Sequence, residues 1–144
     1  MFILVHLITS FIASAAFGVI FNVPKSALLK CGFVGMVGWI IYIILESRLG
    51  IDMVLATLVA SIFIAIISQM FAKVYKMPII VFNVSGIIPL VPGGLAYDAM
   101  RHFVENDYNM AVQMAAKAFM ISGSIAIGLV FSEVINQLIR KSKI

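Results

Sequence analysis

The 144-residue chain is 63% hydrophobic and 11% charged, whereas soluble domains carry about 25% charged residues. This composition excludes an ordinary soluble domain and indicates a polytopic membrane protein. The net charge of +4 does not indicate nucleic-acid binding, because the basic residues lie singly or in pairs between apolar runs. Cys31 is the only cysteine, and the chain contains no HExxH, CxxC, Walker, GxSxG or EF-hand motif. We therefore expect no enzyme activity, no metal site and no cofactor.

The first apolar run covers residues 3–21, about the 20 residues that a helix needs to cross a bilayer. No Lys or Arg precedes it, whereas Lys25 and Lys30 follow it, which predicts an uncleaved helix with its N-terminus outside. His6 lies near the outer end, either as an interfacial residue or as a proton relay. One face of the run carries small residues suited to close helix packing, namely Ser10, Ser14 and Gly18.

Two further spans are predicted over residues 27–45 and 51–72. Trp39 and Tyr42 lie near the far end of the second span, as do the aromatic residues of membrane interfaces. Each span also has a face of small or weakly polar residues, which predicts close packing against other helices. These residues are Ala27, Cys31, Gly35 and Gly38 in the second span, and Thr57, Ser61, Ala65 and Ser68 in the third.

A broken apolar segment follows over residues 77–92 and predicts a short fourth span. Proline removes a backbone donor, and in hydrocarbon each freed backbone group must find a partner inside the protein. A broken span is therefore costly unless it lines a cavity, and such segments mark the binding sites of transporters. Asn83 and Ser85 either contact substrate or satisfy freed carbonyl groups. The candidates for a substrate path in this segment are Asn83, Ser85, Gly86, Pro89 and Pro92.

Gly93 and Gly94 open an amphipathic helix predicted over residues 94–106, which is too short and too charged to cross a bilayer. Free N–H groups at a helix N-terminus form an anion site, and the two glycines allow close approach to the backbone. The alternative is a tight turn without a ligand. Tyr97 and Asp98 follow one turn later, and Asp98 is either a proton-coupling carboxylate or an acid that complements the helix dipole.

The last apolar run covers residues 108–139 and is longer than the hydrocarbon core, so we expect it to tilt or protrude. Lys117 is the only charge well inside this run. A charged residue at such a depth is a functional candidate that faces the bundle interior or water, and here it would attract a carboxylate. The alternatives are an ion pair with Asp98 or Asp52, or a side chain that extends to the interface.

The charge distribution predicts five crossings, with the N-terminus outside and the C-terminus in the cytoplasm. Basic residues flank the first and third loops and form the C-terminal tail, whereas the other loops have mixed charge. If the fourth segment re-entered the membrane instead of crossing it, the chain would cross four times, and one of its ends would lie on the opposite side from the one predicted. The predicted fold is an all-α transmembrane helix bundle, a single domain over residues 1–144. The basic residues are Lys25, Lys30, Lys73, Lys76, Arg140, Lys141 and Lys143.

A motif of polar, proline and glycine residues runs through the broken segment as Asn83-Val84-Ser85-Gly86-Ile87-Ile88-Pro89-Leu90-Val91-Pro92-Gly93-Gly94. Pro78 precedes it, and Tyr97, a polar gap at residues 106–109 and a long helix rich in small residues follow it. With this pattern the chain resembles the threonine/serine exporter family over essentially its whole length. It is most similar to the short membrane-only subunit, which is related to the small component of bacterial two-component succinate exporters.

The resemblance implies export of small hydroxylated amino acids or dicarboxylates across the bacterial inner membrane. It also implies a partner, a longer subunit with a cytoplasmic domain and its own spans, and two halves of opposite orientation could form an inverted repeat. A higher oligomer is compatible with this arrangement. Threonine, serine and succinate all carry a carboxylate, so the sequence does not separate them.

Two other functions compete with an exporter subunit coupled to the proton gradient. The first is a scaffolding or channel-forming subunit whose partner carries the transport residues. The second is an intramembrane enzyme, for which the sequence has no recognisable nucleophile–base pair or metal cluster.

Overall fold

The computed structural model describes residues 1–142 as a bundle of helices, with no strand in that part of the chain. Lys143 of the basic tail lies outside the described residues. Short helical turns precede α2 (η1, Lys25–Ala27), follow it (η2, Ile44–Arg48) and follow α4 (η3, Ile88–Leu90). The all-α prediction is confirmed. The helices are α1 Phe2–Ile20, α2 Leu28–Ile43, α3 Met53–Tyr75, α4 Ile79–Ile87, α5 Gly93–Val104 and α6 Tyr108–Lys141.

Four helical segments are long and apolar enough to cross a bilayer, namely α1, α2 with its flanking turns, α3 and α6. The segments Ile79–Leu90 and Gly93–Val104 qualify only as a combined fifth span, and they are bent by 50° at the break between them. The predicted broken fourth span and the helix after it are therefore both present. The break falls where Pro89 and Pro92 interrupt the helical hydrogen-bond pattern.

Small residues bring the helices together, as the sequence predicted. In membranes, Gly, Ala and Ser let helix backbones approach closely. Gly86 of α4, predicted as part of a substrate path, packs in the same way, because an added Cβ would lie 2.6 Å from Val34 Cγ1 of α2 and 3.0 Å from Ile64 Cγ2 of α3. The small faces predicted for the first three spans are buried: Ser10, Ser14 and Gly18; Ala27, Cys31, Gly35 and Gly38; and Thr57, Ser61, Ala65 and Ser68. Helix α6 also buries Ser124, Gly128 and Ser132, whereas its Ser122 and Ala126 are exposed.

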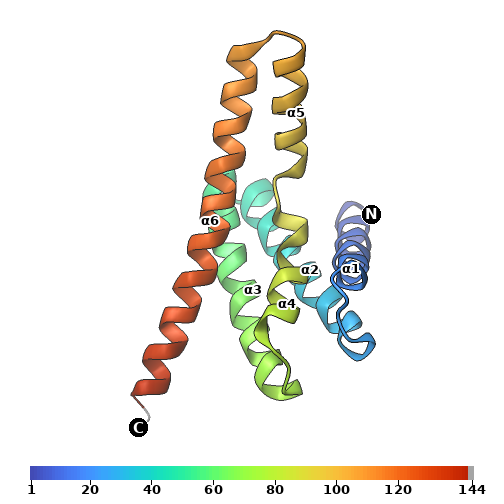
Figure 1. Cartoon of the computed structure of the whole chain (residues 1–144), viewed down its shortest axis with the longest axis vertical. Coiled ribbons are helices and arrows are strands. Elements are labelled where there is room, and N and C mark those ends of the chain that lie inside the picture. Colours follow the sequence, from blue (N-terminus) through green and yellow to red (C-terminus); the bar gives the residue numbers. More distant parts are fainter. Residues whose placement is uncertain (143–144) are drawn as a thin grey trace.

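Helices α3 and α6 run parallel to each other (Figure 1). Near its middle, α3 places Ser61 against Gly128 of α6. Near its end, Lys73 Nζ donates a hydrogen bond to Asn136 Oδ1 over 3.1 Å. Residue numbers therefore increase in the same direction along both helices. The chain between α3 and α6 must return to the end of the bundle at which α3 began. Residues 76–107 therefore cover the full length of α3.

Helix α5 and the first turns of α6 form a hairpin that extends past the other helices, at the top of Figure 1. Ile121 of α6 lies level with Met53, the first residue of α3, because both line one cavity. The turns of α6 before Ile121 therefore lie beyond the start of α3. At the tip, Asn106 adopts a left-handed backbone (φ 64°), and the Asp107 side chain caps α6 by accepting a hydrogen bond from Met110 N over 3.3 Å.

Candidate functional site

The break between α4 and α5 leaves backbone groups exposed at one end of the bundle. Val91 is extended, and Pro92 precedes the first turn of α5 without offering a side-chain cap. The N–H groups of a helix's first turn have no intrahelical partner. The Gly93 N–H donates instead to Val91 O over 2.8 Å. The next two N–H groups, those of Gly94 and Leu95, are the ones available to a ligand.

A cavity of about 190 Å³ lies against this break. Five elements meet there, because the end of α2, the start of α3 and the middle of α6 surround the turn from η3 into α5. Pro89, Pro92 and Gly94 belong to its wall, together with Leu95. The remaining wall consists of Trp39, Tyr42, Met53, Thr57, Leu90, Val91 and Ile121. The cavity therefore combines apolar and aromatic walls with the N-terminal turn of one helix.

The electrostatic character of the cavity follows from α5. Aligned peptide dipoles give a helix N-terminus a partial positive charge, and the free N–H groups point toward an anion bound there. An added Cβ at Gly94 would meet no heavy atom within 4 Å, so packing does not require glycine at this position. The absence of a side chain leaves room beside the Leu95 and Gly94 backbone. This end of the cavity therefore suits a carboxylate.

Two polar side chains of the cavity, Thr57 and Trp39, already form hydrogen bonds within the protein. Thr57 is buried and donates its hydroxyl to Met53 O over 2.8 Å. Trp39 Nε1 donates to His6 Nδ1 of α1 over 3.1 Å, and the Trp39 ring stacks on Tyr42 at 5.1 Å between ring centroids. Helix α1 is thus connected to the cavity through Trp39, although none of its residues lines the cavity.

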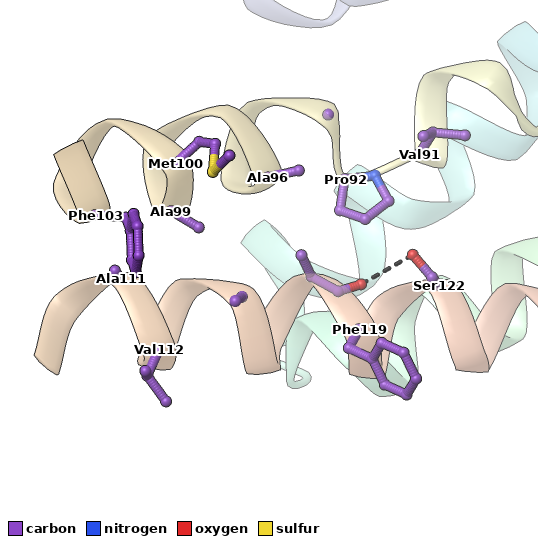
Figure 2. Close-up of a pocket in the computed structure, with 13 residues that line it drawn as sticks. Val91, Pro92, Ala96, Ala99, Met100, Phe103, Ala111, Val112, Phe119 and Ser122 are labelled. Atoms are coloured by element: carbon purple, nitrogen blue, oxygen red, sulfur yellow. Dashed lines mark hydrogen bonds between the residues drawn. The ribbon is translucent and has the colours of Figure 1, made fainter. Parts of the chain in front are cut away.

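A second and larger hollow, of about 510 Å³, lies between α5 and α6 along the hairpin (Figure 2). Phe103 of α5 points toward Ala111 of α6, and Ser122 donates its hydroxyl to Ala118 O over 2.9 Å. With that hydroxyl bound to its own helix, the lining is almost wholly apolar. Gly93 belongs to this groove and not to the smaller cavity. The groove therefore lacks groups that would recognise a small polar solute.

The predicted candidates on α4 lie inside the bundle, away from both hollows. Ser85 is fully buried and donates to Val81 O over 3.2 Å, while Cys31 Sγ donates to the same carbonyl over 3.3 Å. Gly86 serves the close packing of α4 on α2 and α3. Asn83 differs from both, because its buried Oδ1 has no hydrogen-bond partner among the described residues. Asn83 is therefore the polar group of α4 that remains available.

The candidates beyond the PGG turn lie on the protruding hairpin. The Tyr97 side chain is 69% exposed. Asp98 Oδ1 lies 3.7 Å from Nη2 of Arg101 on the same helix, and both side chains are partly exposed. Lys117 is half-buried one turn before Ile121, and within residues 1–142 no acidic group lies within ion-pair distance of it. Neither alternative pairing expected for Lys117, with Asp98 or Asp52, is present in that part of the chain.

Sequence reasoning missed the side chains that complete the cavity. Trp39 and Tyr42 looked like interfacial residues, and Thr57 looked like one member of a small packing face. Their spacing was the available signal, because residues three apart share one face of a helix. That pattern places two aromatic rings together near the end of a span, but it does not show which other helix they face.

Comparison with known proteins identifies the chain's family. No solved structure matches it. A family model described as Threonine/Serine exporter, ThrE, matches residues 6–135. The match includes every residue that lines the small cavity, as well as His6. The chain therefore belongs to the threonine/serine exporter family of membrane transport proteins.

Proposed function

We propose that this protein is a membrane subunit of a heteromeric exporter of small carboxylate metabolites, such as threonine, serine or succinate, coupled to the proton gradient. The observation that carries the proposal is the cavity at the α4–α5 break, where the N-terminal turn of α5 meets aromatic side chains of α2. The solute carboxylate binds the N–H groups of Gly94 and Leu95. The remainder of the solute lies against Trp39, Tyr42 and Thr57.

The size of the cavity supports a small solute. Pockets for drug-sized ligands measure about 300–1,000 Å³, whereas this cavity measures about 190 Å³. Each water molecule in the liquid takes about 30 Å³, so the cavity has the volume of about six waters. An amino acid or a short dicarboxylate fits such a space, and a peptide or a nucleotide does not.

The distribution of charge supports an orientation in the bacterial inner membrane with the N-terminus outside. Lys30 Nζ lies 3.7 Å above the Tyr75 ring, so the first loop is beside the end of α3. Lys73 reaches Asn136 near the end of α6. The basic residues of the first loop, the third loop and the end of α6 are therefore at one end of the bundle. Since positive loops stay in the cytoplasm, that end is the cytoplasmic one in our proposal.

The protruding hairpin supports a companion subunit, which in our proposal is longer and has a cytoplasmic domain and its own spans, as the family resemblance implies. Exposed apolar side chains follow both helices of the hairpin, including Val104 at 76% and Phe119 at 82% exposure. Because α3 and α6 are parallel, one crossing lies between them, which together with α1, α2, α3 and α6 gives five crossings in our proposal. A companion that begins in the cytoplasm would have the opposite orientation, and the two halves would form an inverted repeat with the solute between them.

The test is export of threonine, serine and succinate from cells that contain this chain and the companion subunit. Gly94→Ala fills part of the cavity, and Gly93→Ala adds the same methyl group to the neighbouring groove. Gly123→Ala on α6 is the matched control, since none of the three added Cβ atoms meets a heavy atom within 4 Å. The methyl group added at position 94 would keep the carboxylate away from the N–H groups, and a hydrogen bond to a charged group contributes about 1.5–3 kcal/mol. We therefore expect at least about a tenfold loss of export at low solute concentration for Gly94→Ala alone.

Equal export by all three variants at normal protein levels would contradict the proposal. That outcome would assign the transport residues to the companion and leave a scaffolding role for this chain. A loss of export caused by failed assembly is recognised by co-purification of the two subunits, which Gly94→Ala should preserve.

A further inference from the structure

A cleft of about 230 Å³ lies between α3 and α6, toward the lower end of Figure 1 where both helices finish. On α3 its wall changes from apolar to polar along the helix, because Ile62 and Ile66 are followed by Gln69. On α6 the wall includes Ile135 and Asn136. The α3–α6 cleft therefore has an apolar part deeper in the bundle and a polar part nearer the helix ends.

Positive charge lies at the polar part of the α3–α6 cleft. Lys73 follows Gln69 by one turn of α3, and its Nζ donates to Asn136 Oδ1 of the cleft wall over 3.1 Å. A lysine ammonium has three N–H donors, so this bond leaves two for a ligand. Arg140 follows Asn136 by one turn of α6, on the same face of the helix. Within residues 1–142, neither basic side chain has a carboxylate within 4.0 Å, so no acid of that part of the chain neutralises them.

Glu133 is the acid of α6 that lies close to the cleft in sequence, and amide groups already bind it. Its Oε2 accepts a hydrogen bond from Gln69 Nε2 over 3.4 Å, and its Oε1 accepts one from Gln137 Nε2 over 3.1 Å. Glu133 is not part of the cleft wall. The Lys73 ammonium therefore remains available to an anion from outside the chain.

The length of the cleft corresponds to one leaflet of a bilayer. From Ile62 to Lys73, α3 rises about 16 Å, and half of a hydrocarbon core is about 15 Å. A molecule with its charged group at Lys73 would extend an apolar chain past Ile66 to the middle of the membrane. Lipid tails are as apolar as the side chains that they contact, so the apolar wall alone selects no partner. The charged end of the cleft decides which molecule it selects.

We propose that the α3–α6 cleft binds one anionic phospholipid from the leaflet at the basic end of the bundle. The lipid phosphate accepts hydrogen bonds from Lys73, with Arg140 beside it, and bonds of this kind are strengthened by charge. One acyl chain lies along Ile62, Ile66 and Ile135. Basic pockets between membrane helices bind anionic headgroups at the cytoplasmic side, which is the side of this end in the proposed orientation. The proposal requires that the chain crosses a bilayer, and it does not depend on the solute site.

Two other hollows at helix surfaces differ from this cleft in their chemistry. One lies on α6 around Ile127, and the other lies between α1 and α2 around Phe11 and Met36. The side chains that line both hollows are all apolar. Lipid tails can cover them without any choice of headgroup, so charge selects a lipid only at the α3–α6 cleft among these three.

The test is native mass spectrometry of the purified full chain in detergent, titrated with phosphatidylglycerol or with phosphatidylcholine of the same acyl chains. We expect one phosphatidylglycerol to bind more tightly than further copies and more tightly than phosphatidylcholine. Lys73→Gln should weaken that binding about fivefold, the contribution of one basic residue to attraction of an anionic lipid. Lys25→Gln is the matched control, because Lys25 is an exposed residue of the same end that does not line the cleft.

A second pair of variants tests the apolar part of the cleft. Ile66→Phe enlarges an exposed side chain within the cleft, and Ile127→Phe does the same in the apolar hollow of α6. Because both side chains are exposed, neither change should alter the helix content measured by circular dichroism. Ile66→Phe should weaken phosphatidylglycerol binding, whereas Ile127→Phe should leave it unchanged.

The proposal is overturned if phosphatidylglycerol and phosphatidylcholine bind equally, or if Ile66→Phe has no effect on binding. Equal losses for Lys73→Gln and Lys25→Gln would also overturn it, since binding would then reflect the charge of the whole basic end. If Ile66→Phe releases the companion subunit while phosphatidylglycerol binding stays normal, the cleft is a protein interface and the lipid assignment is wrong. The assay does not involve export, so its failure leaves the proposed solute site standing.

Discussion

Gly86→Ala offers the sharpest test of how the helices are held together around the broken span. The new methyl group would lie 2.6 Å from Val34 Cγ1 and 3.0 Å from Ile64 Cγ2. Both neighbours are fully buried, so neither can turn away into open space. Overpacking of this kind costs about 1–3 kcal/mol, whereas replacing Gly with Ala inside a helix gains up to about 1 kcal/mol. The net expectation is a loss of about 0–2 kcal/mol.

The matched control is Gly123→Ala, which has the same helical gain without the clash, because its Cβ would meet nothing within 4 Å. The two variants should therefore differ by about 1–3 kcal/mol in unfolding free energy. For a chain of this length the difference corresponds to about 3–10 °C in melting temperature. The assay is thermal unfolding of both purified variants in the same detergent, followed by circular dichroism.

Equal melting temperatures for Gly86→Ala and Gly123→Ala would refute the reasoning. That result would mean that α4 is not seated between α2 and α3 as the structure has it. A lower melting temperature for Gly86→Ala together with normal export in cells would show that Gly86 serves packing and not the solute path.

Two further predictions concern residues outside the cavity. Asp98→Asn should change the unfolding free energy by less than about 1 kcal/mol and leave export unchanged, because Asp98 is a partly exposed member of a pair with Arg101. A strong loss of export with unchanged assembly would instead make Asp98 a coupling carboxylate. Cys31, the only thiol of the chain, is fully buried, so a maleimide should label the chain only after unfolding. Rapid labelling of the folded chain would contradict the packing of α1, α2 and α4.

Much of the fold could be predicted from the sequence, because hydrocarbon imposes simple conditions on a chain. Apolar length predicted the long apolar helices, and the small residues of the first three spans predicted which of their faces are buried. Proline and glycine predicted the break, since Pro89 and Pro92 remove backbone donors from an otherwise helical segment. Each of these signals is local, so one segment is enough to show it.

The cavity could be predicted only in part, because its walls come from elements far apart in the chain. Pro89, Pro92 and Gly94 were found through the break itself. Trp39 reaches the cavity only because α2 ends beside the turn into α5, which no local pattern shows. Lys117 was predicted by counting residues from the start of α6. The packing of Ile121 beside Met53 places Lys117 just beyond the level at which α3 begins, a position relative to another helix that such a count does not give.

The position of the break divides the proposed route through the membrane into two parts of unequal length. The cavity lies at the level where α3 begins. In the proposed orientation that level is the outer end of the α3 span, so a solute there has a short distance left to the outer surface. From the cytoplasmic side it must travel along α4 and η3, about 20 Å by their helical rise. Asn83, whose carbonyl oxygen has no hydrogen-bond partner in the described part of the chain, lies midway along that path. The slow step of export is therefore expected on the cytoplasmic side, where α4 must separate from its closely packed neighbours before the solute can enter.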